Sequence, residues 1–200
     1  MPSLPHSPAA DRNKDPILAQ LQAILGERGT ALEIASGTGQ HAVWFAAALP
    51  GWIWQPTEFD PELLPVIAER IRQSGVSNAL PPLRLDVTAP EWPFAEKFDA
   101  MLCANMLHIG PWDACAGLMA GAARHLAPGG MLVTYGPYFE HDVPPAPSNV
   151  AFDQSLRERN ASWGIRQLDD VVAQAARHGL ALARRQAMPA NNLLLVFKAA

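Results

Sequence analysis

Residues 32–45 read LEIASGTGQHAVWF, and this stretch decides the fold of the chain. A short apolar run over 30–35 leads into SGTGQ at 36–40, and a second apolar pattern follows directly. Two glycines separated by one residue, Gly37 and Gly39, let a ligand approach the backbone closely because neither carries a Cβ atom. The start of a following helix also presents free N–H groups. The stretch therefore predicts a ligand-binding turn that joins a strand to a helix.

Short apolar stretches alternate with helical patterns along most of the chain. We expect seven strands, over 30–35, 53–58, 83–85, 98–104, 131–135, 180–187 and 193–198. We expect helices that begin at Asp15, after Gly39 and at Pro61, and helices that cover 112–126 and 168–178. Elements in this order predict an α/β, Rossmann-like sheet that is mostly parallel and has helices on both faces. Only MPANN at 188–192 separates the last two strands, which predicts a C-terminal antiparallel hairpin.

The chain is expected to form one domain, since 200 residues are enough for a single hydrophobic core. Residues 1–11 are rich in proline and are expected to be a flexible tail, so that the domain spans 12–200. The first helix is predicted to begin at Asp15, with Pro16 in its first turn. The rhythm of strands and helices breaks over 136–166, and we expect this segment to cover a substrate.

Composition and charge weigh against several classes of partner. The net charge is −4, the pI is about 5.8, and the densest basic cluster is the pair Arg184-Arg185, so we expect no nucleic-acid partner. The longest apolar run, 42–54, is interrupted by a Pro-Gly pair, so we expect no membrane span. The N-terminus lacks the apolar core of a signal peptide. Cys103 and Cys115 show no metal-ligand spacing, so we expect no metal site. Two cysteines without such a pattern suit a reducing compartment, and with no signal peptide we expect a cytoplasmic protein.

Two nucleotide ligands compete for the glycine turn. Residues 37–42 fit the pattern GxGxxG/A, and Glu58 follows at about the 20-residue distance at which a βαβ unit places a ribose-binding carboxylate. A nicotinamide dehydrogenase would bind a pyrophosphate at the turn, whereas a methyltransferase would bind the methionine and ribose of S-adenosylmethionine (SAM). Glu33, just below the turn, repels a pyrophosphate and suits a cation. Asp86 ends a strand where an adenine amino group could be met. These carboxylates favour SAM.

The motifs resemble those of the class I SAM-dependent methyltransferases. EIASGTG at 33–39 is similar to their ExGxGxG motif, with Ala35 in place of the first glycine. Within that superfamily the chain resembles a small family, the methyltransferase-like 26 type, over about residues 12–197. The stretches that carry this resemblance are RNKDPIL (12–18), LEIASGTGQHA (32–42), WQP (54–56), LDVT (85–88), NMLHIGP (105–111), TYGPY (134–138), SNVAFD (148–153), SLRERN (155–160), WGIR (163–166) and MPANN (188–192).

The resemblance implies which residues contact SAM and its product S-adenosylhomocysteine (SAH). Carried over position by position, these contacts are Ala35, Gly37, Gly39, Glu58, Asp86, Val87 and Asn105. Asn105 is explained equally well as a loop cap. Asn13 belongs to a segment that by analogy folds over the cofactor, with ordinary helix capping as the alternative. His41 lies in the first turn of its helix, where it either touches the cofactor or packs against neighbouring residues.

Candidate catalytic residues follow the strands at the same edge of the sheet, where ligands of parallel sheets bind. His108 is the candidate general base, because histidine titrates near neutral pH, and a loop cap is the alternative. Tyr138 is a candidate wall of the acceptor pocket, as is Tyr135, for which core packing is the alternative. Arg157, in the covering segment, is the candidate partner of an anionic acceptor.

The leading hypothesis is a SAM-dependent methyltransferase that transfers a methyl group in line to an unidentified small-molecule acceptor, as a monomer or a homodimer. One alternative is a protein that binds SAM or SAH without turnover and acts through a protein partner. A second alternative is a nicotinamide-dependent oxidoreductase. The sequence disfavours it, because no lysine has the tyrosine four positions away that a short-chain dehydrogenase needs.

Overall fold

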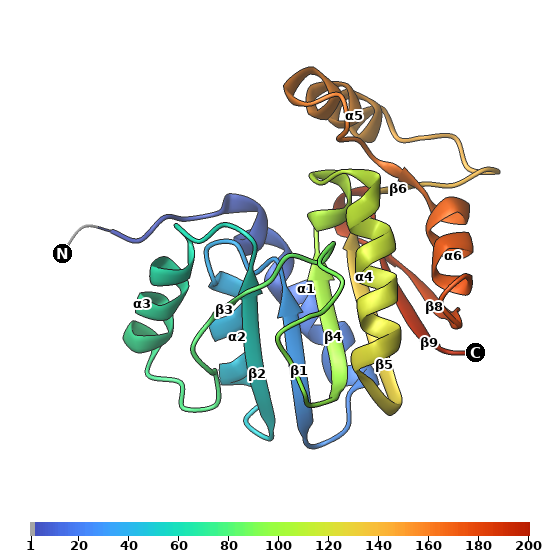
Figure 1. The fold of residues 1–200 in the computed structure, drawn as a ribbon. Coiled ribbons are helices and arrows are strands. Elements are labelled where there is room, and N and C mark those ends of the chain that lie inside the picture. The colour runs from blue at the N-terminus through green and yellow to red at the C-terminus, as the bar shows by residue number, and fades with distance from the viewer. Residues whose placement is uncertain (1–2) are drawn as a thin grey trace.

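The computed structural model describes residues 3–200 and contains a seven-stranded sheet with helices on both faces (Figure 1). The strand order is β3-β2-β1-β4-β5-β9-β8. The strands are β1 (Gly29–Ile34), β2 (Trp52–Glu58), β3 (Leu83–Arg84), β4 (Phe98–Ala104), β5 (Leu126–Gly136), β8 (Leu180–Met188) and β9 (Asn192–Ala199). The predicted Rossmann-like α/β sheet is therefore confirmed.

The five strands from β3 to β5 in this order pair in parallel, because each crossover passes through a helix or a long loop. Strand β9 runs antiparallel to both of its neighbours, β5 and β8. A short 3-10 turn, η2 (Pro189–Asn191), reverses the chain between β8 and β9. The predicted C-terminal hairpin is confirmed, and its first strand, β8, forms an edge of the sheet.

Helices cover both faces of the sheet. These helices are α1 (Pro8–Ile24), α2 (Gln40–Ala48) and α3 (Leu64–Ser74) on one face, and α4 (Trp112–His125) and α6 (Leu168–Ala176) on the other. On the first face Ile17, Phe45 and Trp54 are buried in one cluster, and on the second Leu118 and Val171 are buried in another. Because both faces are covered, the central strands read as nearly continuous apolar runs.

Helix α1 begins earlier than the sequence analysis predicts. It starts at Pro8 instead of Asp15, so residues 8–11, expected in a flexible tail, form its first turn. Ser7 is the N-cap, and its hydroxyl accepts a hydrogen bond from the backbone N–H of Ala10 at 3.3 Å. Pro8 suits the first helical position because its missing N–H would have no partner there. Pro16, expected in the first turn, instead lies inside the helix.

The segment 136–166 contains its own elements. These are β6 (Tyr138–Phe139) and α5 (Pro147–Arg159), and β6 pairs in parallel with β7 (Arg166–Gln167). Figure 1 shows α5 projecting beyond the end of the sheet at which β4 ends and β5 leads into β6. Its start is tied to the C-terminal hairpin, since the Asn149 side-chain amide donates to the carbonyl of Asn191 at 3.0 Å.

None of the helices formed by residues 3–200 combines the length and the apolar character that crossing a bilayer requires.

Candidate functional site

The glycine turn follows β1 and has an unusual backbone. Ala35, Gly37 and Gly39 all have positive φ angles, of 57°, 57° and 75°. A Cβ atom built on Gly37 would meet nothing within 4 Å, whereas one built on Gly39 would lie 3.2 Å from the Cα atom of Ile67 in α3. The two glycines therefore serve different purposes: Gly37 leaves its backbone open, and Gly39 lets α2 begin close against α3.

Ala35 adopts the left-handed conformation that normally favours glycine. For a residue with a Cβ atom this conformation costs about 1–2 kcal/mol. The strain lies at the position where the ExGxGxG motif has its first glycine, next to the open backbone of Gly37. Strained backbone of this kind is concentrated at ligand sites, where the surrounding structure maintains it.

Glu58 ends β2 and reaches the turn. Its Oε2 accepts a hydrogen bond from the Gly37 N–H at 2.7 Å, and its Oε1 accepts from the N–H groups of Phe59 and Asp60 at 2.8 and 3.2 Å. The side chain is 8% exposed. A carboxylate has about four acceptor positions, and these three bonds leave one on Oε2. The structure thus brings Glu58 to the turn in a fixed orientation.

Two buried polar atoms beneath the turn lack partners. Glu33 accepts a hydrogen bond from the Trp54 indole N–H on Oε2 at 2.6 Å, but its Oε1 has no partner among the described residues. The hydroxyl of Ser36 is likewise buried without a partner there. Burial raises the pKa of Glu33 to about 7, against the opposing effects of the Trp54 bond and of the neighbouring Ser36 hydroxyl, which lies close by without meeting hydrogen-bond geometry. Buried unsatisfied polar atoms are rare, and a donor supplied by a ligand or by water would satisfy these.

Asp86 and Val87 follow β3, at the same edge of the sheet as Glu58. Strand β3 pairs Arg84 with Glu58. The Asp86 Oδ1 accepts hydrogen bonds from the backbone N–H and the hydroxyl of Thr88, at 2.9 and 2.7 Å, which fixes the turn. Val87 is buried, with its carbonyl accepting from the Trp92 indole N–H at 3.3 Å. The Asp86 Oδ2 atom takes no part in these bonds.

Asn105 and His108 follow β4. Asn105 has a φ of 64° and donates its backbone N–H to the carbonyl of Tyr135 at 2.7 Å, which joins the ends of β4 and β5. His108 ends a short 3-10 helix, η1 (Met106–His108), and is 4% exposed. Its ring packs edge-on to Phe152 of α5, with centroids 5.7 Å apart. Burial, with the nearby Arg166, lowers the pKa of His108 to about 4.

Tyr138, predicted as a wall of the acceptor pocket, turns its hydroxyl into the core, while the residue lines a hollow between the segment that follows it and the C-terminal hairpin. The side chain is 7% exposed and belongs to the core cluster beneath α4 and α6. Its hydroxyl donates to the hydroxyl of Thr134 at 2.8 Å, and burial raises its pKa. The alternation of side chains along the backbone from β5 into β6 turns this residue toward the core.

Arg157 also differs from its predicted role. Its Nε donates to Asp153, four residues earlier in α5, at 2.8 Å, and the side chain lines a groove beside α6. The arginine of this segment that reaches the loop around His108 is Arg166, which donates to the carbonyls of Leu107 and Gly110 at 2.9 and 2.5 Å. The helical phase of α5 decides this difference, and sequence spacing alone does not reveal it.

Asn13 and His41 are brought together, but their side chains contact each other. The Nε2 of His41 lies 2.6 Å from the Oδ1 of Asn13, and the His41 ring stacks on Phe45 at 5.2 Å. Burial lowers the pKa of His41 to about 4. The pair joins α1 to the start of α2. The proposed contact of either residue with a cofactor remains a prediction.

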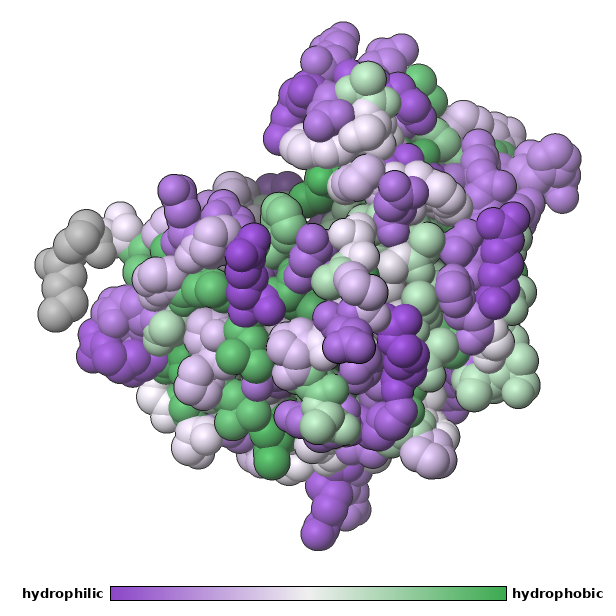
Figure 2. Space-filling view, viewed as in Figure 1, coloured by the Kyte–Doolittle hydropathy of each residue, from purple (hydrophilic) through white to green (hydrophobic). Residues whose placement is uncertain are grey.

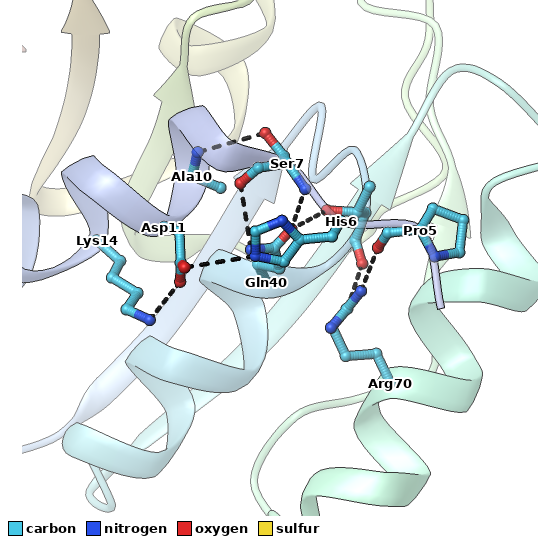
Figure 3. Close-up of polar contacts among 9 residues, drawn as sticks. Pro5, His6, Ser7, Ala10, Asp11, Lys14, Gln40 and Arg70 are labelled. Carbon is cyan, nitrogen blue, oxygen red and sulfur yellow. Dashed lines mark hydrogen bonds and ion pairs between the residues drawn. The ribbon is translucent and has the colours of Figure 1, made fainter. Parts of the chain in front are cut away.

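The segment before α1 lies against the glycine turn (Figure 3). The Ser7 N–H donates to the side-chain oxygen of Gln40 at 2.5 Å, and Arg70 donates from Nε to the carbonyl of Thr38 at 2.7 Å. Arg70 also reaches the carbonyl of Pro5. The sequence analysis missed Gln40 and Arg70. Gln40 lies within the SGTGQ stretch, which was the available signal, whereas Arg70 lies 32 residues from Thr38 and gave none.

No group of three His, Cys, Asp or Glu side chains within residues 3–200 is arranged to hold a metal ion.

Comparisons with known proteins bear on the family and on the fold of the chain. Residues 4–199 match the family model described as "Protein of unknown function (DUF938)". The mitomycin 7-O-methyltransferase MmcR aligns with a TM-score of 0.82 at 19% identity, over 96% of this chain and 54% of its own. An O-methyltransferase family 2 protein from Planctomyces limnophilus DSM 3776, in complex with apigenin, aligns with a TM-score of 0.78 at 19% identity, over 96% and 60%.

The methyltransferase CalO1 of calicheamicin biosynthesis, in its SAH-bound form, aligns with a TM-score of 0.76 at 14% identity, over 96% of this chain and 55% of its own. The chain thus spans little more than half the length of these solved structures. At such identities the similarity establishes the fold, while the narrower resemblance to the methyltransferase-like 26 type remains a prediction. The chain therefore belongs to the DUF938 family and has the fold of the class I SAM-dependent methyltransferases.

Proposed function

We propose that this protein is a SAM-dependent methyltransferase that acts on a small molecule. The observation that carries the proposal is the glycine turn: the backbone of Gly37 faces open space while its N–H is held by Glu58 of the neighbouring strand. Proteins of similar structure support it, since they include a mitomycin 7-O-methyltransferase and an SAH-bound methyltransferase.

The residues at the turn fit SAM in chemical character. Glu58 keeps an acceptor position for a ribose hydroxyl, and Asp86 has a carboxylate oxygen for the adenine amino group. Glu33 and Ser36 carry the unpartnered oxygens that a cationic amino group would satisfy. When bound, SAM supplies an electrophilic methyl group on a sulfonium centre. A pyrophosphate would meet two carboxylates here, which argues against the nicotinamide alternative.

The acceptor is proposed to lie between the ends of β4 and β5 and the projecting α5. Figure 2 shows the surface hollowed beside α5 on the side toward α3. His108 stands at this boundary, in contact with Phe152. Its pKa of about 4 keeps His108 neutral at pH 7 and also makes it a weaker base than an ordinary histidine. Its proposed part is to accept a hydrogen bond from a hydroxyl, thiol or amine nucleophile and to take the proton as the methyl group is transferred. Arg157 has no part in this proposal, because Asp153 neutralises it.

Calorimetric titration with SAH, and separately with NADH, tests cofactor binding. We expect SAH to bind and NADH not to bind. Glu58→Ala should weaken SAH at least about tenfold, since a hydrogen bond to a charged group contributes about 1.5–3 kcal/mol. Glu62→Ala, at an exposed acid after β2, is the matched control and should leave the affinity unchanged. Preferential binding of NADH would contradict the proposal.

Turnover is tested by comparing methylated metabolites in an extract treated with SAM and either the wild-type protein or the His108→Gln variant. New methylated products that require the wild-type protein are expected. SAH binding without any product, together with co-purification of a single protein, would instead support a binding protein that acts through a partner.

A further inference from the structure

A second concave site lies away from the glycine turn. It is a groove of about 600 Å³ between the start of α4, the end of α5 and helix α6. Its lining includes Trp112, Phe139, Arg157, Arg166, Asp170 and Arg177, and no residue of the glycine turn belongs to it. Three arginines in one groove are notable in a chain whose net charge is −4. This groove is independent of the proposed SAM site.

The three arginines differ in how far their charges are already satisfied. Arg157 forms an ion pair with Asp153 at 2.8 Å, so it adds little net charge to the groove. Arg166 donates from Nε to the carbonyl of Leu107 and from Nη2 to those of Gly110 and Ser162. These bonds use three of the five N–H groups of a guanidinium, and within residues 3–200 the two on Nη1 have no acceptor.

Arg177 is the most available of the three. It lies exposed at the end of α6, and its one side-chain bond is from Nη1 to the amide oxygen of Gln174 at 3.3 Å. No carboxylate of the described chain lies within ion-pair distance of it. Asp170 is the single acid of the groove. Arg166 and Arg177, set against Asp170, leave a surplus of about one positive charge, which a monoanion would balance better than a dianion.

The groove also offers flat apolar surface. Trp112 is 36% exposed, and the Arg166 guanidinium carbon lies 5.8 Å from the centroid of its ring. Phe139 is half-buried on the opposite element, β6. A guanidinium fork pairs with a carboxylate through two parallel hydrogen bonds, and an aromatic ring stacks on a tryptophan face. We propose that this groove binds an aromatic monocarboxylate, with Arg177 and the free Nη1 of Arg166 on the carboxylate and Trp112 against the ring.

Calorimetric titration with 2-naphthoate tests the proposal, and 2-naphthamide serves as the neutral probe of the same shape. We expect naphthoate to bind at least tenfold more tightly than the amide. Arg177→Gln should reduce the naphthoate affinity about tenfold or more, and Trp112→Leu should weaken naphthoate and amide alike. The matched control is Arg184→Gln, which removes the same charge from an exposed arginine of β8 whose contacts are also to glutamine amides. It should leave both affinities unchanged.

Two further arms locate the site and define the anion. Naphthoate should bind with unchanged affinity in the presence of saturating SAH. Competition between the two ligands would place naphthoate at the glycine turn instead of in the groove and would overturn the proposal. Inorganic phosphate should bind more weakly than naphthoate. Equal binding of naphthoate and naphthamide, tighter binding of phosphate, or an unchanged affinity in Arg177→Gln would each overturn the proposal. Thermal unfolding of each variant checks that it remains folded.

Discussion

Ala35 shows how a single side chain stores strain beside the proposed ligand site. Its φ of 57° is costly for alanine, and glycine removes that cost but loses more conformational entropy on folding. We therefore expect Ala35→Gly to raise the free energy of unfolding by up to about 1 kcal/mol, measured by urea denaturation. Ala190→Gly is the matched control, since Ala190 has a φ of 56° in the turn between β8 and β9. It should stabilise similarly, while only Ala35→Gly should change the affinity for SAH.

His108 has a titration that distinguishes its environment from that of an exposed histidine. Burial and Arg166 lower its pKa to about 4, so the ring stays neutral through the physiological range. An NMR titration of the imidazole protons, assigned with the His108→Gln variant, should show no protonation of His108 between pH 8 and pH 5.5. A titration of the His108 protons near pH 6.5 would contradict the environment described for His108.

At the scale of elements, Gly37 and Gly39 make the junction of β1 with α2, and they respond differently to the same change. Both substitutions to alanine place a Cβ atom at positive φ, but only at Gly39 does that atom meet the backbone of Ile67, at 3.2 Å. We expect Gly39→Ala to lower the free energy of unfolding by about 2–4 kcal/mol and Gly37→Ala by about 1 kcal/mol.

The affinity for SAH should respond differently from stability in these two variants, because Gly37→Ala should lose more affinity for each kcal/mol of stability lost than Gly39→Ala does. Gly37→Ala fills the open space above the turn, so it should weaken SAH strongly for its small cost in stability. Urea denaturation and calorimetric titration of the two variants check this. Equal losses of stability in the two variants would mean that Gly39 does not pack against α3 as described.

At the scale of the whole molecule, three buried groups set the dependence of stability on pH. His41 and His108 have pKa values of about 4 in the folded protein, and Glu33 has a pKa of about 7. Between pH 4.5 and 6.5 the unfolded chain binds protons at both histidines, which destabilises the fold as pH falls. The folded protein instead keeps the proton of Glu33, which stabilises it as pH falls. The two effects oppose each other.

The pKa values of these three groups predict how steeply the free energy of unfolding depends on pH, and a single substitution should change that slope. From the three together, the free energy of unfolding should fall by about 1 kcal/mol for each unit that the pH drops near pH 5.5. Glu33→Gln removes the opposing term, so the slope should become steeper by about 1 kcal/mol per unit, while the variant gains stability at pH 8. Urea denaturation across pH measures both. His141→Gln, at an exposed histidine, should leave the slope unchanged, and a slope unaltered by Glu33→Gln would refute the burial of this carboxylate.

The sequence largely predicts which residues lie at the edge of the sheet where ligands bind, because the carboxyl ends of parallel strands meet at the same edge. Gly37, Asp86 and Asn105 each follow a strand and Glu58 ends one, so all four lie at that edge. The sequence predicts a helix start at Asp15 because Pro16 suits a first helical turn, although Ser7 and Pro8 form an equally good cap seven residues earlier. Tyr138 turns into the core and Arg157 pairs with Asp153, because neither a position near a strand end nor spacing along a helix gives the direction of a side chain.

The order of elements, the parallel sheet with its terminal hairpin and the glycine turn were determined by the sequence alone, because each depends on local periodicity and on backbone freedom within a few residues. The tertiary structure decided which polar groups meet. His41 finds Asn13 28 residues away, and Arg166 reaches the carbonyl of Leu107 59 residues away. Such contacts, and the burial that shifts the pKa values of Glu33 and His108, exist only after the chain has packed, because they depend on neighbours that no local pattern specifies.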